Sequence, residues 1–200
     1  GILAAYRRGT CVDMITVSVS LLGIAIPGFL LSMFLMLFFG VHLKWLPVAG
    51  YVQMSQGILE HLRYLLLPAL SLGVVQAAYI TRMSRSAMLD VLYMNYIRTA
   101  RAKGLKESAV VLVYGLKNAG PTILTVVGQS FGSLVTGTIV TETLFNIPGL
   151  GMLTMTSITR RDVFVIQGVV LFVTFIYVLV NLAVDILYGF VDPRIQLGNK

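Results

Sequence analysis

The sequence has little charge and almost no cysteine. Only 12% of its 200 residues are Asp, Glu, Lys or Arg, whereas 57% are hydrophobic and the mean hydropathy is +0.88. The single cysteine, Cys11, excludes an internal disulfide and any metal site built from several cysteines. These proportions exclude an ordinary soluble domain and place the chain in the bilayer-spanning class.

Familiar catalytic motifs are missing as well. The sequence contains no GxxxxGK[ST] phosphate loop, no GxSxG nucleophile elbow, no HExxH pair and no paired carboxylates within its apolar segments. We therefore expect no catalytic residue, no metal site and no cofactor bound by this chain.

Long apolar runs are what the sequence does have. A helix needs about 20 residues to cross a hydrocarbon layer of roughly 30 Å, and four segments are long enough. They show no two-residue alternation, so helices rather than a closed barrel are expected. The prediction is an all-α integral membrane bundle, one domain over residues 1–200, with transmembrane helices at about 14–41, 64–85, 119–144 and 163–188. Pro27 and Gly28 predict a kink in the first of them.

The basic residues are distributed unevenly around these spans. Eleven Lys and Arg lie before residue 14, between 82 and 118 and after 189, against four between 42 and 63 and between 145 and 162. Because cytoplasmic loops carry the excess of Lys and Arg, both ends and the loop at about 86–118 are expected in the cytoplasm. Membrane topology therefore explains the net charge of +7, and no nucleic-acid partner is expected.

Small and acidic residues mark particular places in the spans. Gly128, Gly132 and Thr136 recur at intervals of four and predict a close helix interface, although such spacing also occurs by chance. Glu142 at the outer end of its span and Asp185 near the cytoplasmic boundary are candidates for an ion pathway. For both, a local structural role is the stronger interpretation.

Two connecting segments carry further signals. The second outer loop begins with the turn residues Pro148, Gly149 and Gly151 and is apolar enough to fold back against the bundle. The loop at 86–118 contains a short polar helix. Asn95 is a plausible N-cap, and Gly104 stands where a residue in the left-handed conformation would end the helix. This helix either docks in a cytoplasmic partner or is a basic loop that touches anionic lipid.

The order of residues in that loop favours docking. "YIRTARAKGL" resembles the cytoplasmic EAA loop of binding-protein-dependent ABC importer permeases, in the variant of the dipeptide/oligopeptide/nickel class. The resemblance covers the whole chain, with "WLP" at 45–47, "LPA" at 67–69, "RMSRSAMLDVL" from Arg82, "TETLFNIPGLG" from Thr141, "RD" at 161–162, "NLAVDILY" at 181–188 and "DPR" at 192–194. In the generic E-A-A-x-x-x-G pattern of this loop, Arg98 and Thr99 stand where the glutamate and the first alanine are usual, whereas Ala100 and Gly104 match the pattern. Lys117 stands where a later proline is usual.

The resemblance implies a function and a set of partners. The chain would be a B-type permease subunit in a prokaryotic plasma membrane, forming half of a pathway for short peptides with a second homologous permease. An extracytoplasmic binding protein would deliver the ligand, and two cytoplasmic ATPase subunits would bind ATP and Mg. Family members begin with two further helices before the "GILAAYRRGT" region, so we expect these to be missing from this sequence. The residues implied to couple to the ATPase are Tyr96, Ile97, Arg98, Thr99, Ala100, Arg101, Ala102, Lys103, Gly104 and Leu105.

Two other interpretations stay open. An ion-gradient-driven transporter or channel would use Glu142 and Asp185 as its key acids. A scaffold that transports nothing would use the basic loop to recruit a cytoplasmic protein. Neither accounts for the family motifs along the chain.

Overall fold

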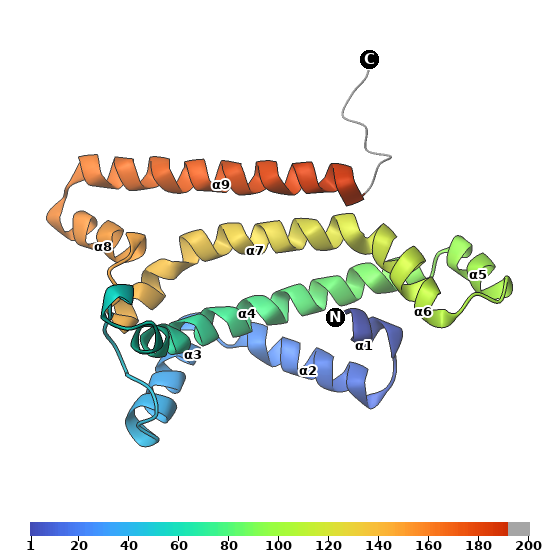
Figure 1. Cartoon of the computed structure of the whole chain (residues 1–200), viewed down its shortest axis with the longest axis horizontal. Coiled ribbons are helices and arrows are strands. Elements are labelled where there is room, and N and C mark those ends of the chain that lie inside the picture. The colour runs from blue at the N-terminus through green and yellow to red at the C-terminus, as the bar shows by residue number, and fades with distance from the viewer. Residues whose placement is uncertain (192–200) are drawn as a thin grey trace, which may run out of the picture. The chain divides into compact units, whose positions relative to one another are not determined.

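The chain is helical throughout the part that the computed structural model describes, which is residues 1–191 without the side chains of 135–137, 190 and 191. No strand occurs in that part. In chain order its helices are α1 (Ile2–Tyr6), α2 (Cys11–Ala25), α3 (Gly28–Leu35), η1 (Met36–His42), η2 (Met54–Gln56), α4 (Ile58–Leu92), α5 (Asn95–Ala102), α6 (Glu107–Ala109), η3 (Val110–Gly115), α7 (Leu116–Phe145), α8 (Leu150–Arg160) and α9 (Val163–Val191) (Figure 1). The predicted all-α membrane fold is confirmed, while the "DPR" motif at 192–194 lies outside the described residues.

Among the described residues, three helices are long and apolar enough to cross a membrane: Ile58–Leu92, Glu107–Leu134 and Val163–Gly189. The bent pair Cys11–Ala25 and Gly28–His42 makes a fourth if it is counted as one span. Its two helices are interrupted at Pro27, which has no amide proton for the helical ladder and clashes with the preceding turn. The kink predicted there is therefore a complete break.

The long helices extend past the predicted spans. Helix α4 begins at Ile58 rather than near residue 64, and its first turns contain an exposed ion pair in which Arg63 Nη1 lies 3.3 Å from Glu60 Oε1. Polar side chains one turn apart continue a helix into water at small cost. Hydropathy therefore located the apolar part of this helix but not its ends.

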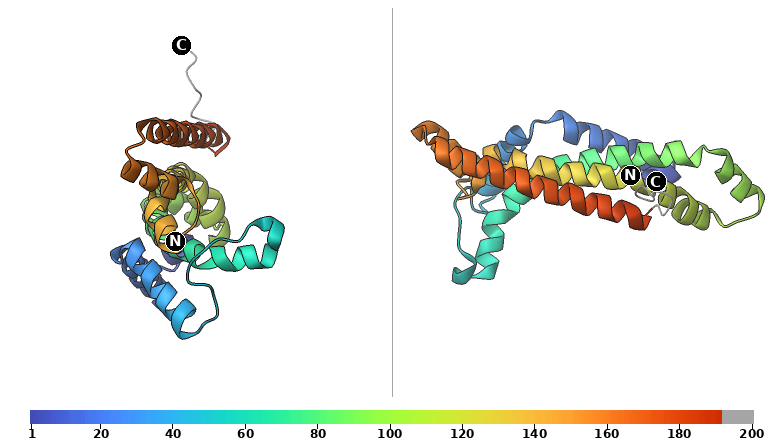
Figure 2. Two further views of the ribbon diagram at one scale, coloured as in Figure 1. Left: turned by 90° about the vertical axis from the view of Figure 1, so that its left-hand side faces the viewer. Right: turned by 90° about the horizontal axis from the view of Figure 1, so that it is seen from above.

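One compact unit comprises residues 1–23, 77–131 and 178 onward. Its core gathers side chains from the last turns of α4, from α5 and from η3, with Met88, Ile97 and Val110 fully buried. Figure 2 shows α5 beyond the point where α4 ends and before the chain returns through α6 and η3. The core of this unit therefore anchors the short helix.

The second compact unit comprises residues 24–76 and 132–177. Leu67 and Phe145 are its largest fully buried side chains. Ser32 and Ser71 are equally buried, and their hydroxyls donate to carbonyls of their own helices, at 2.9 Å to Gly28 and 2.8 Å to Pro68. Buried polar groups are thus satisfied locally. The single domain over 1–200 stays a prediction.

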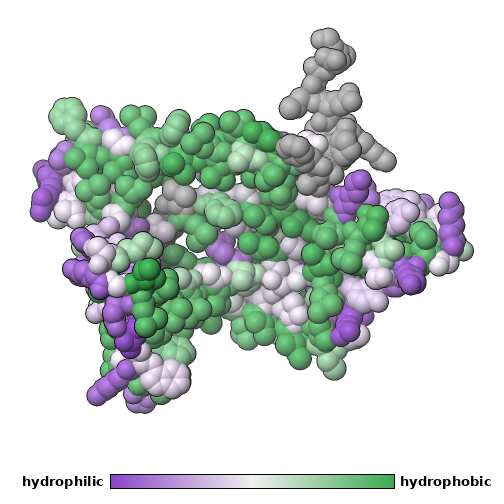
Figure 3. Space-filling view, in the orientation of Figure 1, coloured by the Kyte–Doolittle hydropathy of each residue, from purple (hydrophilic) through white to green (hydrophobic). Residues whose placement is uncertain are grey.

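Helix α9 exposes apolar side chains along its length, which Figure 3 shows as a continuous green surface. Phe164 and Leu171, for example, are 87% and 71% exposed. Gln167, Thr174 and Asp185 are exposed as well, but most of the exposed surface of α9 is apolar, which is typical of a helix that faces lipid.

Candidate functional site: the short basic helix and the turns around it

Helix α5 is attached to the core by two side chains. Ile97 and Ala100 lie three residues apart, so they share one face, and they are 0% and 5% exposed. They belong to the cluster that contains Met88 and Val110. Because α5 has only eight residues, it is too short to be stable alone in water, and this contact is what orders it.

The rest of α5 and the turn after it face outward. Exposed residues are Tyr96, Arg98, Thr99, Arg101, Ala102, Lys103, Gly104 and Leu105. Ten residues, 96–105, were expected to couple to the ATPase. Eight of them are exposed and available to a partner, whereas Ile97 and Ala100 are buried. Ala100 packs inward, and Ala102 is the small exposed residue of this helix.

Gly104 ends α5 in a left-handed conformation, with φ of +74°. Its amide donates to the Arg101 carbonyl at 2.9 Å, and the Leu105 amide donates to the Ala100 carbonyl at 3.4 Å. This pair of bonds is a Schellman motif, which satisfies carbonyls that the end of a helix leaves without partners. At the other end, Met94 precedes the helix without a side-chain cap, and Asn95 is its first residue rather than its N-cap.

The electrostatics of this surface are basic. Arg101 is paired, since its Nη2 lies 2.7 Å from Glu107 Oε1 across the turn. Arg98 and Lys103 are exposed, and no described residue forms an ion pair with either. Partial burial raises the pKa of the Tyr96 phenol above its ordinary value, so that side chain is neutral at physiological pH. The surface can receive an acidic or polar partner.

The outer-loop turn is assembled around Glu142. Its Oε2 accepts a hydrogen bond of 3.0 Å from the Met152 amide, the third residue of α8. A carboxylate in this position caps a helix and interacts favourably with its positive end. Added Cβ atoms at Gly149 and Gly151 would collide with the Glu142 carboxylate and the Ile139 backbone. Both glycines therefore permit a close approach of backbone to side chain.

Pro148 precedes this turn, and α8 follows it as an eleven-residue helix. At its far end, Arg161 is left-handed with φ of +58°, and Asp162 Oδ1 accepts a 3.2 Å bond from the Val165 amide. The "RD" motif thus ends α8 and caps α9.

Two of the three small residues on α7, Gly128 and Gly132, lie along the side that meets α9. A Cβ added at Gly128 would lie 2.6 Å from Cγ2 of Val184, and one at Gly132 would collide with the ring of Tyr177. Each contact lies within a single compact unit. Thr136 lies in α7, but its side chain is outside the described residues.

An ion pair between α2 and α4 was not predicted from the sequence. Arg85 Nε and Nη2 donate to Asp13 Oδ1 and Oδ2 at 2.6 and 2.9 Å, and the Gly9 amide donates to Oδ2 at 3.0 Å. Asp13 is 5% exposed. Nothing in their spacing of 72 residues signals that they pair.

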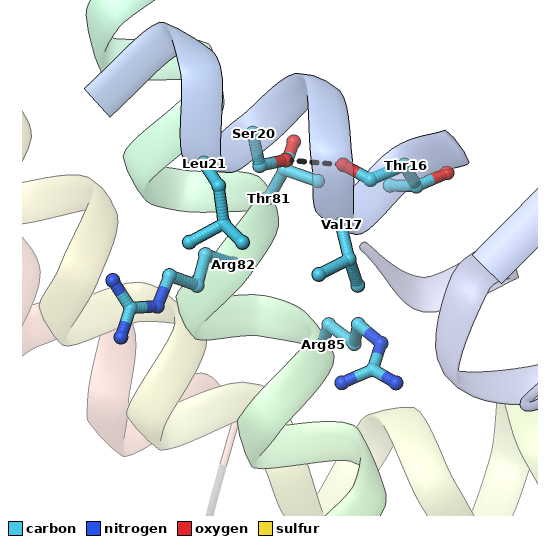
Figure 4. A pocket seen from close by; sticks show the side chains of 7 residues that line it. All are labelled: Thr16, Val17, Ser20, Leu21, Thr81, Arg82 and Arg85. Atoms are coloured by element: carbon cyan, nitrogen blue, oxygen red, sulfur yellow. Dashed lines mark hydrogen bonds between the residues drawn. The ribbon is translucent and has the colours of Figure 1, made fainter. Parts of the chain in front are cut away.

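A small cavity of about 110 Å³ lies beside this ion pair (Figure 4). It is lined by Thr16, Val17, Ser20, Leu21, Thr81, Arg82 and Arg85. The hydroxyls of Thr16 and Ser20 donate to carbonyls of α2, at 2.7 Å to Val12 and 2.8 Å to Thr16. Among the described residues no group of three or more His, Cys, Asp or Glu could hold a metal ion.

These features define a class: a multi-pass helical membrane protein in which a short basic helix, held by an apolar core, joins two long spans. The chain belongs to the family of binding-protein-dependent transport system inner membrane components, whose model matches residues 1–197. The resemblance stated from the motifs is thereby confirmed.

Curated relatives match nearly the whole chain. It is 43% identical over 196 residues to a probable peptide ABC transporter permease protein of Sinorhizobium fredii, covering 98% of this chain and 63% of the relative. It is 41% identical to a di/tripeptide transport system permease protein of Pseudomonas aeruginosa and 40% identical to a dipeptide transport system permease protein of Escherichia coli. These alignments cover 98% of this chain and 64% and 65% of the relatives, so the chain spans just under two thirds of their length.

Proposed function

We propose that this chain is the membrane-spanning part of a permease subunit in an ATP-driven importer, and that α5 is its coupling helix. The subunit itself is non-catalytic. ATP and Mg bind to separate cytoplasmic ATPase subunits, and α5 transmits their movement to α4 and α7. Family membership and the printed names of the relatives support this proposal.

The geometry of α5 is the observation that carries the proposal. Ile97 and Ala100 attach the helix to the core that also contains Met88 of α4 and Ala119 of α7. A force on the exposed face therefore reaches both long helices through packed side chains, which transmit displacement because protein interiors are nearly incompressible. A loop that served only topology would not need a buried anchor.

Partners, orientation and substrate follow from the same assignment. The pathway lies between this subunit and a second homologous permease, and an extracytoplasmic binding protein delivers the ligand. Two ATPase subunits bind on the side of α5, which is cytoplasmic together with both ends of the chain, in a prokaryotic inner membrane. The substrates are short peptides, as the names of the relatives suggest.

Charge reversal on α5 tests the proposal. Arg98→Glu and Lys103→Glu, in the complex of the full-length permease with its ATPase, should reduce ATP-dependent peptide uptake at least tenfold while membrane insertion is unchanged. Lys117→Glu is the matched control, because it makes the same charge change at the start of α7 and leaves α5 intact. Normal uptake with both α5 variants, or an equal loss with the control, would contradict the assignment.

The ion-gradient alternative has less support. Glu142 would have to be available to an ion, yet it caps α8 through the Met152 amide. Asp185 is exposed on α9, toward the end of the helix.

A further inference from the structure

Helix α7 exposes a polar stripe where a span surrounded by lipid would expose apolar side chains. Between Leu116 and Leu134 its exposed residues are Lys117, Asn118, Thr122, Thr125, Gln129, Phe131 and Ser133. Phe131 alone among them is apolar. Leaving aside Lys117 at the helix start, the polar residues recur at intervals of four, three, four and four, which confines them to an arc of roughly 80° on a helix of 3.6 residues per turn.

The chemistry of this stripe does not fit hydrocarbon. An amide that cannot form hydrogen bonds in an apolar medium is strongly disfavoured, because it loses the bonds that it makes with water. Gln129 is exposed, and its side chain makes no hydrogen bond to another described residue. Helix α9 differs in proportion: Leu171, Phe172 and Phe175 are more than half exposed, and Gln167 and Thr174 are isolated among such apolar residues.

Neighbouring groups extend the polar surface on both sides. The Thr125 and Tyr188 hydroxyls share a hydrogen bond between α7 and α9. In the other compact unit, Gln76 Nε2 of α4 donates to Ser133 Oγ at 2.7 Å. In each unit, then, a side chain of a neighbouring helix bonds to a hydroxyl of α7, which is more than one misplaced glutamine would produce.

We infer that the α7 stripe, residues Asn118, Thr122, Thr125, Gln129 and Ser133, lines the water-filled pathway through which the solute passes. This inference rests on the proposed transport function and assigns residues to it. Asn118 and Thr125 also donate to carbonyls one turn earlier, at 2.6 Å to Tyr114 and 3.0 Å to Pro121. Water satisfies the exposed Gln129 amide in the absence of solute, and a passing peptide replaces that water with its own amides.

The stripe also indicates how the pathway treats charge. Between Lys117 and Glu142 the sequence of α7 has no charged residue, so the lining offers neutral donors and acceptors. A pathway must bind its solute weakly enough to release it. Neutral amides and hydroxyls do so for acidic, basic and zwitterionic peptides alike, whereas a fixed charge would retain peptides of the opposite sign.

Cysteine accessibility tests this inference in the intact transporter. Cys11→Ser provides the background, into which Thr122→Cys, Gln129→Cys and Phe131→Cys are introduced singly. Phe131 is the matched control, since it is 56% exposed on the same helix but points about 200° away from Gln129. The readout is the rate of modification by a charged, membrane-impermeant methanethiosulfonate, measured by mass shift with and without ATP and with saturating dipeptide.

The expected result is modification of Thr122→Cys and Gln129→Cys at least tenfold faster than of Phe131→Cys, slowed by the dipeptide. Modification of both stripe variants at the control rate in every nucleotide state would overturn the inference, because the stripe would then lie against lipid or packed protein. Uptake by the unmodified variants separates the two proposals. If the variants take up peptide but the stripe cysteines do not react, only the assignment of the stripe to the pathway is refuted. If the stripe cysteines react but the complex never takes up peptide, the proposed transport function is refuted.

Discussion

Single residues with unusual requirements hold the turns at both ends of the long helices. Gly104, Gly149 and Gly151 differ in why they are glycine. Gly104 has φ of +74° and open space around it, whereas the other two would collide with neighbouring atoms if they carried a Cβ. The first requirement is conformational and the second is steric, so substitutions at them should behave differently.

Gly104→Ala tests the conformational requirement. A non-glycine residue in the left-handed region costs about 1–2 kcal/mol, while no clash is added. We expect the amides of residues 104 and 105 to exchange with deuterium roughly 5–30-fold faster. Gly104→Asn should restore most of the protection, because asparagine tolerates this conformation better. Equal exchange in all three proteins would contradict the role assigned to Gly104.

Glu142→Ala tests the cap of α8. Losing the acceptor for the Met152 amide should destabilise the first turn of α8 by about 1 kcal/mol. Hydrogen exchange at residues 150–152 should accelerate about fivefold. Glu142→Gln keeps an acceptor oxygen and should stay near the parent, which distinguishes a cap from an ion-pathway acid. Loss of uptake in Glu142→Gln with α8 intact would favour the pathway acid.

Among the elements, two contacts decide how helices pack within the unit of residues 1–23, 77–131 and 178 onward. Arg85 and Asp13 join α4 to α2 with two parallel hydrogen bonds, a geometry that lysine cannot reproduce. Gly128 allows Val184 of α9 to approach α7 closely. The first contact depends on charge and the second on volume.

Breaking the ion pair should be more harmful than exchanging it. Asp13→Asn or Arg85→Met leaves one partner mostly buried and unpaired, so we expect a lower yield of monodisperse protein and a lower melting temperature. The exchange Asp13→Arg with Arg85→Asp should recover part of the loss. If each single variant melted like the parent protein, the pair would have no structural role.

Gly128→Val should disrupt the packing of α7 against α9. The added atoms would overlap Val184, and overpacking of this kind costs about 1–3 kcal/mol. Adding Val184→Ala should recover more than half of the change in melting temperature. The same Val184→Ala change in the parent serves as the control, since there it leaves a small void and destabilises slightly. Independent, additive effects would show that the two residues are not in contact.

At the scale of the whole molecule, the sequence predicted the fold class because long apolar runs permit few alternatives in lipid. It located the apolar parts of α4, α7 and α9 and the turn at Gly104. It did not predict the helical ends, since residues such as Glu60 and Arg63 continue a helix without changing its hydropathy pattern. Pro27 was expected to bend a span and instead ends α2.

The candidate site was predictable only in part. The order of residues in "YIRTARAKGL" marked α5, but not which side faces the core, because an eight-residue helix has too few apolar positions to define a face. The pairing of Asp13 with Arg85 depends on how distant segments pack, which a single sequence does not reveal. The polar stripe on α7 appears only when exposure is known, because its hydroxyls and amides are spread among apolar residues in the sequence.

The proposed coupling requires that the exposed face of α5 contacts an ATPase subunit. Site-specific crosslinking in membranes tests this contact, with a photoreactive side chain at Ala102 or Lys103 and, as the control, at Lys117. We expect an adduct of the permease and the ATPase from residues 102 and 103 that is much stronger than the adduct from 117. Crosslinks from residues 102 and 103 to lipid alone, with the ATPase present and active, would contradict it.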